Sequence, residues 1–482
     1  MKPCSLPHLP NGKLLLQPST CLSRRHASYR QPIKPLPQSA PQPYWRRRPA
    51  STTTTAKQWA THVQQTGIED QDPSQRGKTL LFAGMNSYPH TPTSPTSSSM
   101  KVWEEASEAV LSPDATIGYW PTGIEEFAEK VLGRDRPRTW MRDWVEGRTL
   151  EELMARPDVT AAFILSSSIA ILASAQEHTA STSLLPFGTT HLAGHGFIGT
   201  LTALVAAGRL DLSTGVRLAM MYASVPSTPP SSNKKSRRYL TTILSARQFH
   251  SLSSPPFDIQ QPYGLSDAAE TSDSPAQRRR AMQLILDEVH AMQREWALYE
   301  DEDYAAAAII NSSKVLGVTG TINGVWQVIE RLQQLGLANP VMDVSVPAPY
   351  HTDLMKHAVP KFAEVLDRCS FRDPPTEAGH ASSPIEPVIL DPISTHPIGP
   401  CAAALAPFLT HQLRWHKTLA RLYLPAVPAV SSFHTVGKGA RGLGIMLRGE
   451  LKRRPEGSKM ITVEEFGVDV EQEEPRVRRA FG

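Results

Sequence analysis

A glycine-rich stretch, Gly194-His-Gly-Phe-Ile-Gly199, carries the strongest chemical signal in this sequence. It follows a predicted strand, and the apolar residues from Leu201 to Val205 then recur at the spacing of a buried helix face until Gly208 ends the helix. Glycines at such a turn remove Cβ atoms where the backbone bends sharply and another group approaches closely. In α/β enzymes a strand-turn-helix of this kind holds either a phosphate or a nucleophile.

Three interpretations of this turn are open at the level of its residues. Gly194-His-Gly-Phe-Ile-Gly199 matches the G-x-G-x-x-G fingerprint of dinucleotide sites. That fingerprint requires an acidic residue about twenty positions later, and Asp211 comes earlier, in a loop after the helix. The second interpretation is a nucleophile elbow related to G-x-S-x-G, and the third is a structural turn without chemistry.

Five stretches together resemble the malonyl-CoA:acyl-carrier-protein transacylases, or S-malonyltransferases, in the right order from about Leu80 to Leu447. The glycine-rich turn is similar to the G-H-S-x-G-E elbow of that family. The other four are Phe82-Ala-Gly-Met-Asn-Ser-Tyr88 against F-P-G-Q-G-S-Q, Ser168-Ile-Ala170, His351 and Met355 in a P-x-H-x-x-x-M segment, and Leu413-Arg-Trp415 in a late helix.

The resemblance implies a covalent mechanism. A Ser at the elbow attacks the malonyl thioester, a His acts as general base, backbone N–H groups hold the oxyanion, and an Arg pairs with the malonyl carboxylate. His351 stands in the general-base position, and Asn311 is retained from the N-S-P motif. Met85 takes a Gln position at the first glycine turn.

The nucleophile and the carboxylate-binding Arg of that mechanism have no counterpart here. The nucleophile position is Gly196 when the turn is aligned forward from Gly194, and Phe197 when it is aligned backward from the helix, because the turn has one extra residue. The Arg position is Tyr222, and the elbow Glu becomes Thr200. We therefore treat Gly196, Phe197, Tyr222, Met85, Asn311 and His351 as the candidate site.

The elements that would position these residues follow from periodicity. A strand near 78–82, a buried helix over 160–175 and the elbow predict an α/β domain with a hydrolase-like parallel sheet, over 79–224 plus 346–450. Between them, the predicted order βαββαβ over 239–345 is that of an inserted ferredoxin-like α+β subdomain. A strand near 385–391, a helix over 405–423 and a charged tail over 451–482 complete the prediction.

Composition limits the function classes. The chain has 50 Lys and Arg against 46 Asp and Glu in 482 residues. The first 68 residues contain basic residues and no acid, which predicts a mitochondrial transit peptide or a disordered basic tail. The remainder is mildly acidic, which argues against nucleic-acid binding. The four cysteines have no metal-ligand spacing and no disulfide pattern, and the apolar run over 160–175 is short for a membrane span.

Four functions remain as hypotheses. They are a mitochondrial-matrix S-malonyltransferase that works by another route, for example with Thr189 or Thr190 in place of the missing Ser, a catalytically impaired paralogue, an esterase-like hydrolase, and a dinucleotide oxidoreductase. The first two take malonyl-CoA or another acyl-CoA and acyl carrier protein as partners. We expect neither a cofactor nor a metal.

Overall fold

The structure is a computed structural model of the 482-residue chain. It describes residues 77–85, 87–91, 95–112, 137–147, 156–227, 238–247, 275–299, 303–344, 346–372, 386–424, 429–452 and 461–467, with residues 124, 126 and 129. These residues belong to one compact unit within Val63–Gly482. The predicted transit peptide over 1–68 lies outside the described residues.

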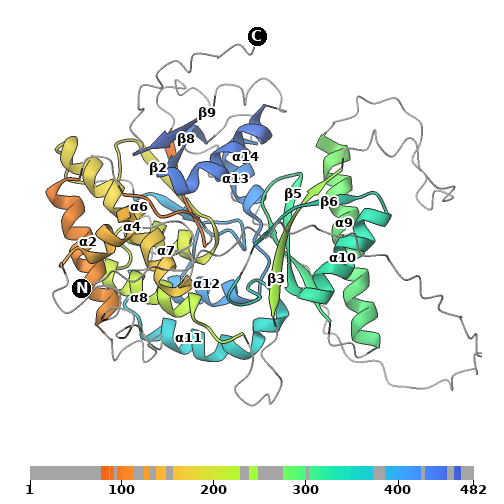
Figure 1. Ribbon diagram of the computed structural model, residues 1–482. Coiled ribbons are helices and arrows are strands. Elements are labelled where there is room, and N and C mark those ends of the chain that lie inside the picture. Colours follow the sequence, from red (N-terminus) through yellow and green to blue (C-terminus); the bar gives the residue numbers. More distant parts are fainter. Residues whose placement is uncertain are drawn as a thin grey trace, which may run out of the picture. The chain divides into compact units, whose positions relative to one another are not determined.

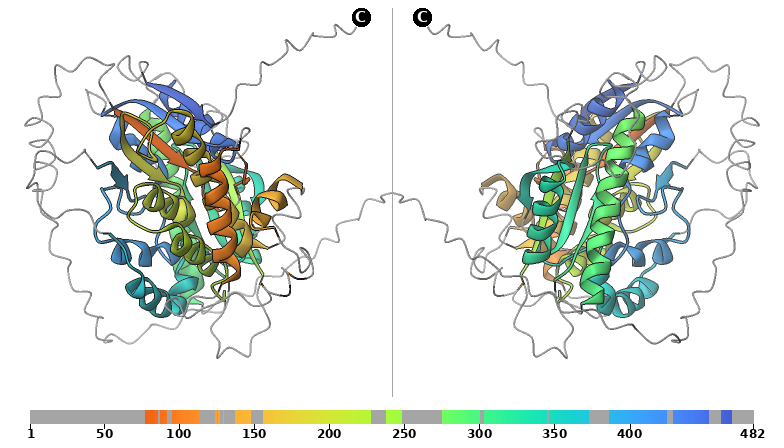
Figure 2. Two further views of the ribbon diagram at one scale, coloured as in Figure 1. Left: turned by 90° about the vertical axis from the view of Figure 1, so that its left-hand side faces the viewer. Right: turned by 90° about the vertical axis from the view of Figure 1, so that its right-hand side faces the viewer.

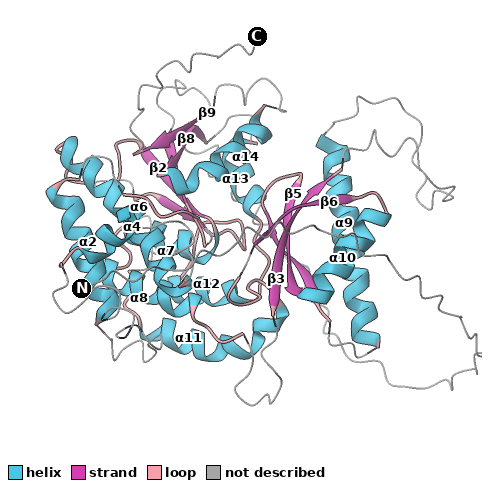
Figure 3. Cartoon of the chain, in the orientation of Figure 1, coloured by secondary structure: helices cyan, strands magenta, loops and turns pink. Residues whose placement is uncertain are grey.

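A five-stranded, entirely parallel sheet forms the larger part of this unit (Figures 1 and 3). The strand order is β7-β2-β1-β8-β9. The strands are β1 (Gly77–Phe82), β2 (Thr189–Gly194), β7 (Val388–Leu390), β8 (Val430–Val436) and β9 (Thr462–Phe466). β1 and β2 end at the same edge, with Phe82 paired to Gly194. That edge carries the first glycine turn and the elbow.

The helices of this part are mostly amphipathic or buried, as their sequences require. They are α2 (Ser97–Leu111), α4 (Trp140–Gly147), α6 (Pro157–His178), α7 (Gly196–Ala206), α8 (Leu212–Ala223), α11 (Val359–Arg368), α12 (Cys401–Leu405), α13 (Trp415–Tyr423) and α14 (Arg441–Leu451), with short 3₁₀ turns at Asp353–Ala358, Ala406–Leu409 and Lys438–Ala440. α6 is long and apolar enough to cross a membrane by composition, but 94% of its apolar window is buried inside the fold. It is the core helix that its sequence predicts.

A separate four-stranded antiparallel sheet carries two helices on one face (Figures 1 and 2). Its elements in chain order are β3 (Tyr239–Ala246), α9 (Pro275–Leu298), β4 (Ala305–Ile310), β5 (Val315–Thr321), α10 (Ile322–Gln334) and β6 (Ala338–Val344). The strand order β4-β5-β3-β6 with this βαββαβ sequence is the ferredoxin-like arrangement. The predicted fold class is confirmed, while the domain limits remain predictions.

Alternation along these strands separates two faces. Leu244 and Leu316 lie in the core under α9 and α10. Thr241 and Thr319, on the other face, donate and accept one hydrogen bond of 2.8 Å between their hydroxyls. Because side chains alternate in a strand, one face builds the subdomain core and the other is left for the site.

Two elements differ from the sequence prediction. The helix predicted over 405–423 is interrupted, because Leu413 pairs with β4 instead: its N–H donates to the Ala308 carbonyl at 2.9 Å, and its carbonyl accepts from Ile310 N–H at 2.8 Å. Within the predicted charged tail, β9 pairs in register with β8 and closes the sheet edge. In both segments the secondary structure depends on pairing with a strand distant in the sequence, which local periodicity does not reveal.

Candidate functional site

A cavity of about 150 Å³ lies between the edge where β1 and β2 end and the uncovered face of the antiparallel sheet. All six candidate residues from the sequence line it, although they come from five separate parts of the chain. Its apolar lining is Met85, Phe197, Ile198, Ile243, Ile309, Val344, Val346, Ala348 and Leu413, and its polar lining is His195, Tyr222, Thr241, Asn311, Thr319, Tyr350 and His351, beside Gly196. The structure brings these candidates together, and their roles remain predictions.

The elbow is built by close contact between two glycines. A Cβ on Gly194 would lie 2.0 Å from the carbonyl carbon of Gly199, and a Cβ on Gly199 would lie 2.9 Å from the Gly194 carbonyl carbon. Between them Gly196 has φ +67° and is the first residue of α7. The position with the left-handed backbone of a nucleophile elbow is therefore Gly196, which has no side chain.

Phe197 belongs to an aromatic cluster. Its ring stacks on Tyr222 with centroids 4.2 Å apart and planes at 16°, and Tyr222 stacks on Tyr350 at 4.5 Å and 19°. Phe362 and Phe408 pack against Phe197 with centroids at 5.4 and 5.7 Å. The two positions at which the sequence aligns the nucleophile and the carboxylate-binding Arg are thus stacked on each other.

His351 combines burial, strain and an unpartnered ring nitrogen. It is only 8% exposed and has φ +63°, a left-handed conformation that is uncommon for a residue with a side chain. Its N–H donates to the Leu409 carbonyl at 2.8 Å, which holds the backbone there. Nδ1 is buried with no hydrogen-bond partner among the described residues. Such a group at a cavity wall is a candidate for contact with a ligand.

Burial sets the protonation of His351. Desolvation, followed by the nearby His195, lowers the pKa of His351 to about 3, against a smaller opposing hydrogen bond with the His411 backbone. The imidazole is therefore neutral near pH 7. The neutral imidazole is the form that can accept a proton, although a pKa of about 3 makes it a weak general base near pH 7.

Several solved structures have the same fold as this chain. An acyl-carrier-protein S-malonyltransferase from Bartonella henselae matches with a TM-score of 0.53 and 16% identity, over 82% of this chain and 96% of that chain. The chain has the malonyltransferase fold. A malonyl-CoA-acyl carrier protein transacylase from Coxiella burnetii matches with a TM-score of 0.50 and 15% identity, over 82% of this chain and 94% of that one.

The same fold occurs in larger enzymes. The acyltransferase domain from the second module of the salinomycin polyketide synthase matches with a TM-score of 0.51 and 16% identity, over 86% of this chain and 76% of that one. At the level of sequence, no protein-family model and no curated protein matches the chain.

His195 also lines the cavity, and it is not among the candidate residues chosen from the sequence. Its Nε2 lies 2.8 Å from Oδ1 of Asn311, and its ring meets Trp415 edge-on with centroids 5.3 Å apart. Burial lowers its pKa, so it is neutral and donates this hydrogen bond through Nε2–H. Its place immediately before Gly196 was the signal available in the sequence.

The hydroxyl groups of the described lining are all hydrogen-bonded. Tyr222 Oη donates to the Phe408 carbonyl at 3.3 Å, and Tyr350 Oη donates to the Tyr222 carbonyl at 2.8 Å. Burial, then the neighbouring Tyr350, raises the pKa of Tyr222, which keeps the phenol neutral. Thr241 and Thr319 bond each other. The described lining contains no Lys, Arg, Asp or Glu side chain.

Two hypotheses from the sequence lose their structural basis. Thr189 and Thr190 begin β2, five and four residues before its end at Gly194, which is about 15 Å of strand away from the elbow. They cannot replace the missing hydroxyl. Asp211 caps α8 by accepting from Thr214 N–H at 2.8 Å and does not end a strand, so it is not placed to bind a ribose.

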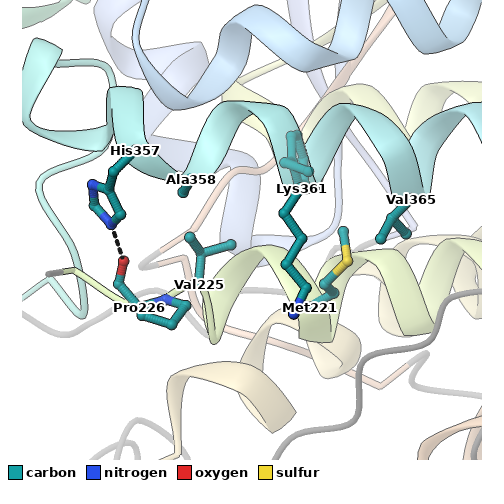
Figure 4. Close-up of a pocket in the computed structure, with 8 residues that line it drawn as sticks. Met221, Val225, Pro226, His357, Ala358, Lys361 and Val365 are labelled. Carbon is teal, nitrogen blue, oxygen red and sulfur yellow. Dashed lines mark hydrogen bonds between the residues drawn. The ribbon is translucent and has the colours of Figure 1, made fainter. Parts of the chain in front are cut away.

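A second cavity, also about 150 Å³, lies between the end of α8 and α11 (Figure 4). Met221, Val225 and Val365 make it largely apolar, and the side chain of Lys361 runs along it. His357 Nε2 lies 3.0 Å from the Pro226 carbonyl at its end. It shares no lining residue with the candidate site.

Proposed function

We propose that this chain binds an acyl thioester, presented as acyl-CoA or on acyl carrier protein, and forms no covalent acyl-enzyme. The observation that carries the proposal is Gly196: the elbow of an acyltransferase fold has the backbone that presents a nucleophile, with φ +67°, and no side chain. The cavity beside it supports thioester binding, because the N–H groups that begin α7 have no intrahelical partner and can donate to a carbonyl oxygen.

The second candidate is S-malonyl transfer without an acyl-serine. The unpartnered Nδ1 of His351 favours it. In this route the carrier thiol gives its proton to Nδ1, its sulfur attacks the thioester carbonyl, and the coenzyme A thiolate leaves and takes the proton. Because losing a covalent nucleophile costs several orders of magnitude in rate, we expect slow turnover.

Intact-protein mass spectrometry after incubation with malonyl-CoA tests the proposal. We expect no adduct on the wild-type chain with malonyl-CoA or, in a second sample, with hexanoyl-CoA, and equilibrium dialysis of the second sample should show bound hexanoyl-CoA. A stoichiometric adduct would reveal a nucleophile and contradict the proposal.

His351→Ala separates the two candidates. If malonyl reaches acyl carrier protein at the same background rate with both proteins, binding without transfer is the better description. If the wild type is faster by tenfold or more, His351 acts as the base of the direct route.

We also propose that the chain works in the mitochondrial matrix. The basic, acid-free composition of residues 1–68 supports this. Fusing these residues to a fluorescent protein should direct it to mitochondria, and a diffuse cytosolic signal would count against matrix localisation.

A further inference from the structure

We infer that the cavity selects a short, uncharged acyl group and rejects malonyl. This rests on the proposed function, since it names the thioester that the same cavity would take. The carrying observation is the aromatic stack of Phe197, Tyr222 and Tyr350 in a lining whose described residues include no cationic side chain. A malonyl carboxylate in this cavity would have no charged partner.

The polar side chains of the described lining carry no charge, and its tyrosine hydroxyls already donate hydrogen bonds within the protein. His351 and His195 have lowered pKa values and carry no charge near pH 7. The Tyr222 and Tyr350 hydroxyls donate to backbone carbonyls, so they are not free to donate to a ligand carboxylate. Burying an ionised carboxylate without a charged partner is strongly unfavourable.

The start of α7 also lines the cavity and would favour negative charge. In the proposed binding mode the thioester oxygen already takes these N–H donors. The carboxylate carbon of malonyl is two carbons beyond the thioester carbonyl carbon, and the described lining offers it aromatic, aliphatic and neutral polar side chains but no cation. The same place suits an alkyl end, which gains free energy on leaving water.

The size of the cavity limits the acyl group. A cavity of about 150 Å³ is comparable to an engineered apolar cavity of similar size that holds benzene. The acyl group should therefore contain up to about six carbon atoms.

Calorimetry with matched thioesters tests this inference. Isovaleryl-CoA replaces the carboxylate of malonyl-CoA by an isopropyl group of nearly the same shape, and coenzyme A controls for binding of the nucleotide. We expect isovaleryl-CoA to bind at least tenfold more tightly than malonyl-CoA. In a straight-chain series, affinity should rise from acetyl to hexanoyl and fall at decanoyl.

The outcomes separate this inference from the proposed function. Equal or tighter binding of malonyl-CoA would overturn the neutral-acyl inference while leaving thioester binding intact. If every thioester binds no better than coenzyme A, both fail. A series that rises through decanoyl would overturn the size limit.

A pair of variants tests whether the acyl group binds in this cavity. Ile243→Trp adds bulk to a half-buried wall of the cavity and should reduce the affinity for hexanoyl-CoA at least tenfold. Val341→Trp adds the same side chain at a position on β6 that is 61% exposed and outside the lining, and should leave affinity unchanged. If Ile243→Trp binds hexanoyl-CoA as tightly as the wild type, the acyl group does not bind in this cavity. If that variant does not fold, the comparison of isovaleryl-CoA with malonyl-CoA on the wild type decides.

Discussion

At the scale of single residues, buried neutral histidines couple stability to pH. Burial lowers the pKa of His351 to about 3 and that of His191 to about 4, below the value of 6.5 for an unfolded chain. Below about pH 6.5 the unfolded state therefore binds more protons than the folded state. Stability is full above that pH and is lost as the pH falls toward the folded pKa values.

We expect the free energy of unfolding to fall by about 2 kcal/mol for each of these two histidines between about pH 7 and pH 5. Urea unfolding at several pH values measures this. His351→Asn is the matched variant, because Asn tolerates the positive φ at this position. Its stability should depend less steeply on pH, and an identical slope in both proteins would contradict the assignment to His351.

A serine at position 196 should not restore an acyl-enzyme. There is space for its Cβ, whose nearest neighbour would be Leu413 Cδ1 at 3.6 Å, but φ is +67°. We expect Gly196→Ser and the control Gly196→Ala to lose about 1–2 kcal/mol of stability equally, through backbone strain. Neither should gain a malonyl adduct by mass spectrometry, because the described lining of the cavity has no cationic side chain to hold the malonyl carboxylate; a stoichiometric adduct on Gly196→Ser alone would contradict this prediction.

At the scale of elements, the packing of α7 on β2 depends on glycine. A Cβ on Gly194 would meet backbone atoms of Gly199 and Thr200 at 2.0–2.2 Å, and backbone cannot yield as a flexible side chain does. Gly194→Ala should lower the free energy of unfolding by about 3 kcal/mol or more, at the upper end for point mutants. Gly442→Ala, on the exposed face of α14 with nothing within 4 Å, should be neutral or slightly stabilising. Denaturant titration of both variants measures the contrast, and equal losses would refute the packing explanation.

At the scale of the whole described unit, β9 completes the parallel sheet. It pairs with β8 over five residue pairs, from Ser432–Thr462 to Val436–Phe466, and α14 packs against both strands. A chain that ends at Lys452 would leave β8 with an unpaired edge, and exposed edges promote aggregation. We expect a clear loss of soluble protein, whereas a chain that ends at Gly467 should behave as the full chain. Size-exclusion chromatography compares the two, and a soluble monomer ending at Lys452 would show that β9 is dispensable.

Residue types and their local order predicted much of the fold and six of the residues that line the cavity. Hydrophobic period and turn residues are local properties, so the buried helix α6, the elbow and the βαββαβ order follow from them. Five of the six candidate residues that line the cavity follow a strand or turn that the motifs mark, and the sixth, Tyr222, lies near the end of helix α8. The sequence also showed that the elbow has no hydroxyl, because the residues at the aligned positions are Gly196 and Phe197.

Other features depend on partners distant in the chain, and they became visible in the folded structure. The pairing of Leu413 with β4 overrides a helical pattern, and β9 joins the sheet despite a charged composition. The stack of Phe197 on Tyr222, and the neutral state of His195 and His351, arise from burial. Burial and contact are properties of the folded chain, because residues far apart in sequence supply the walls that exclude water.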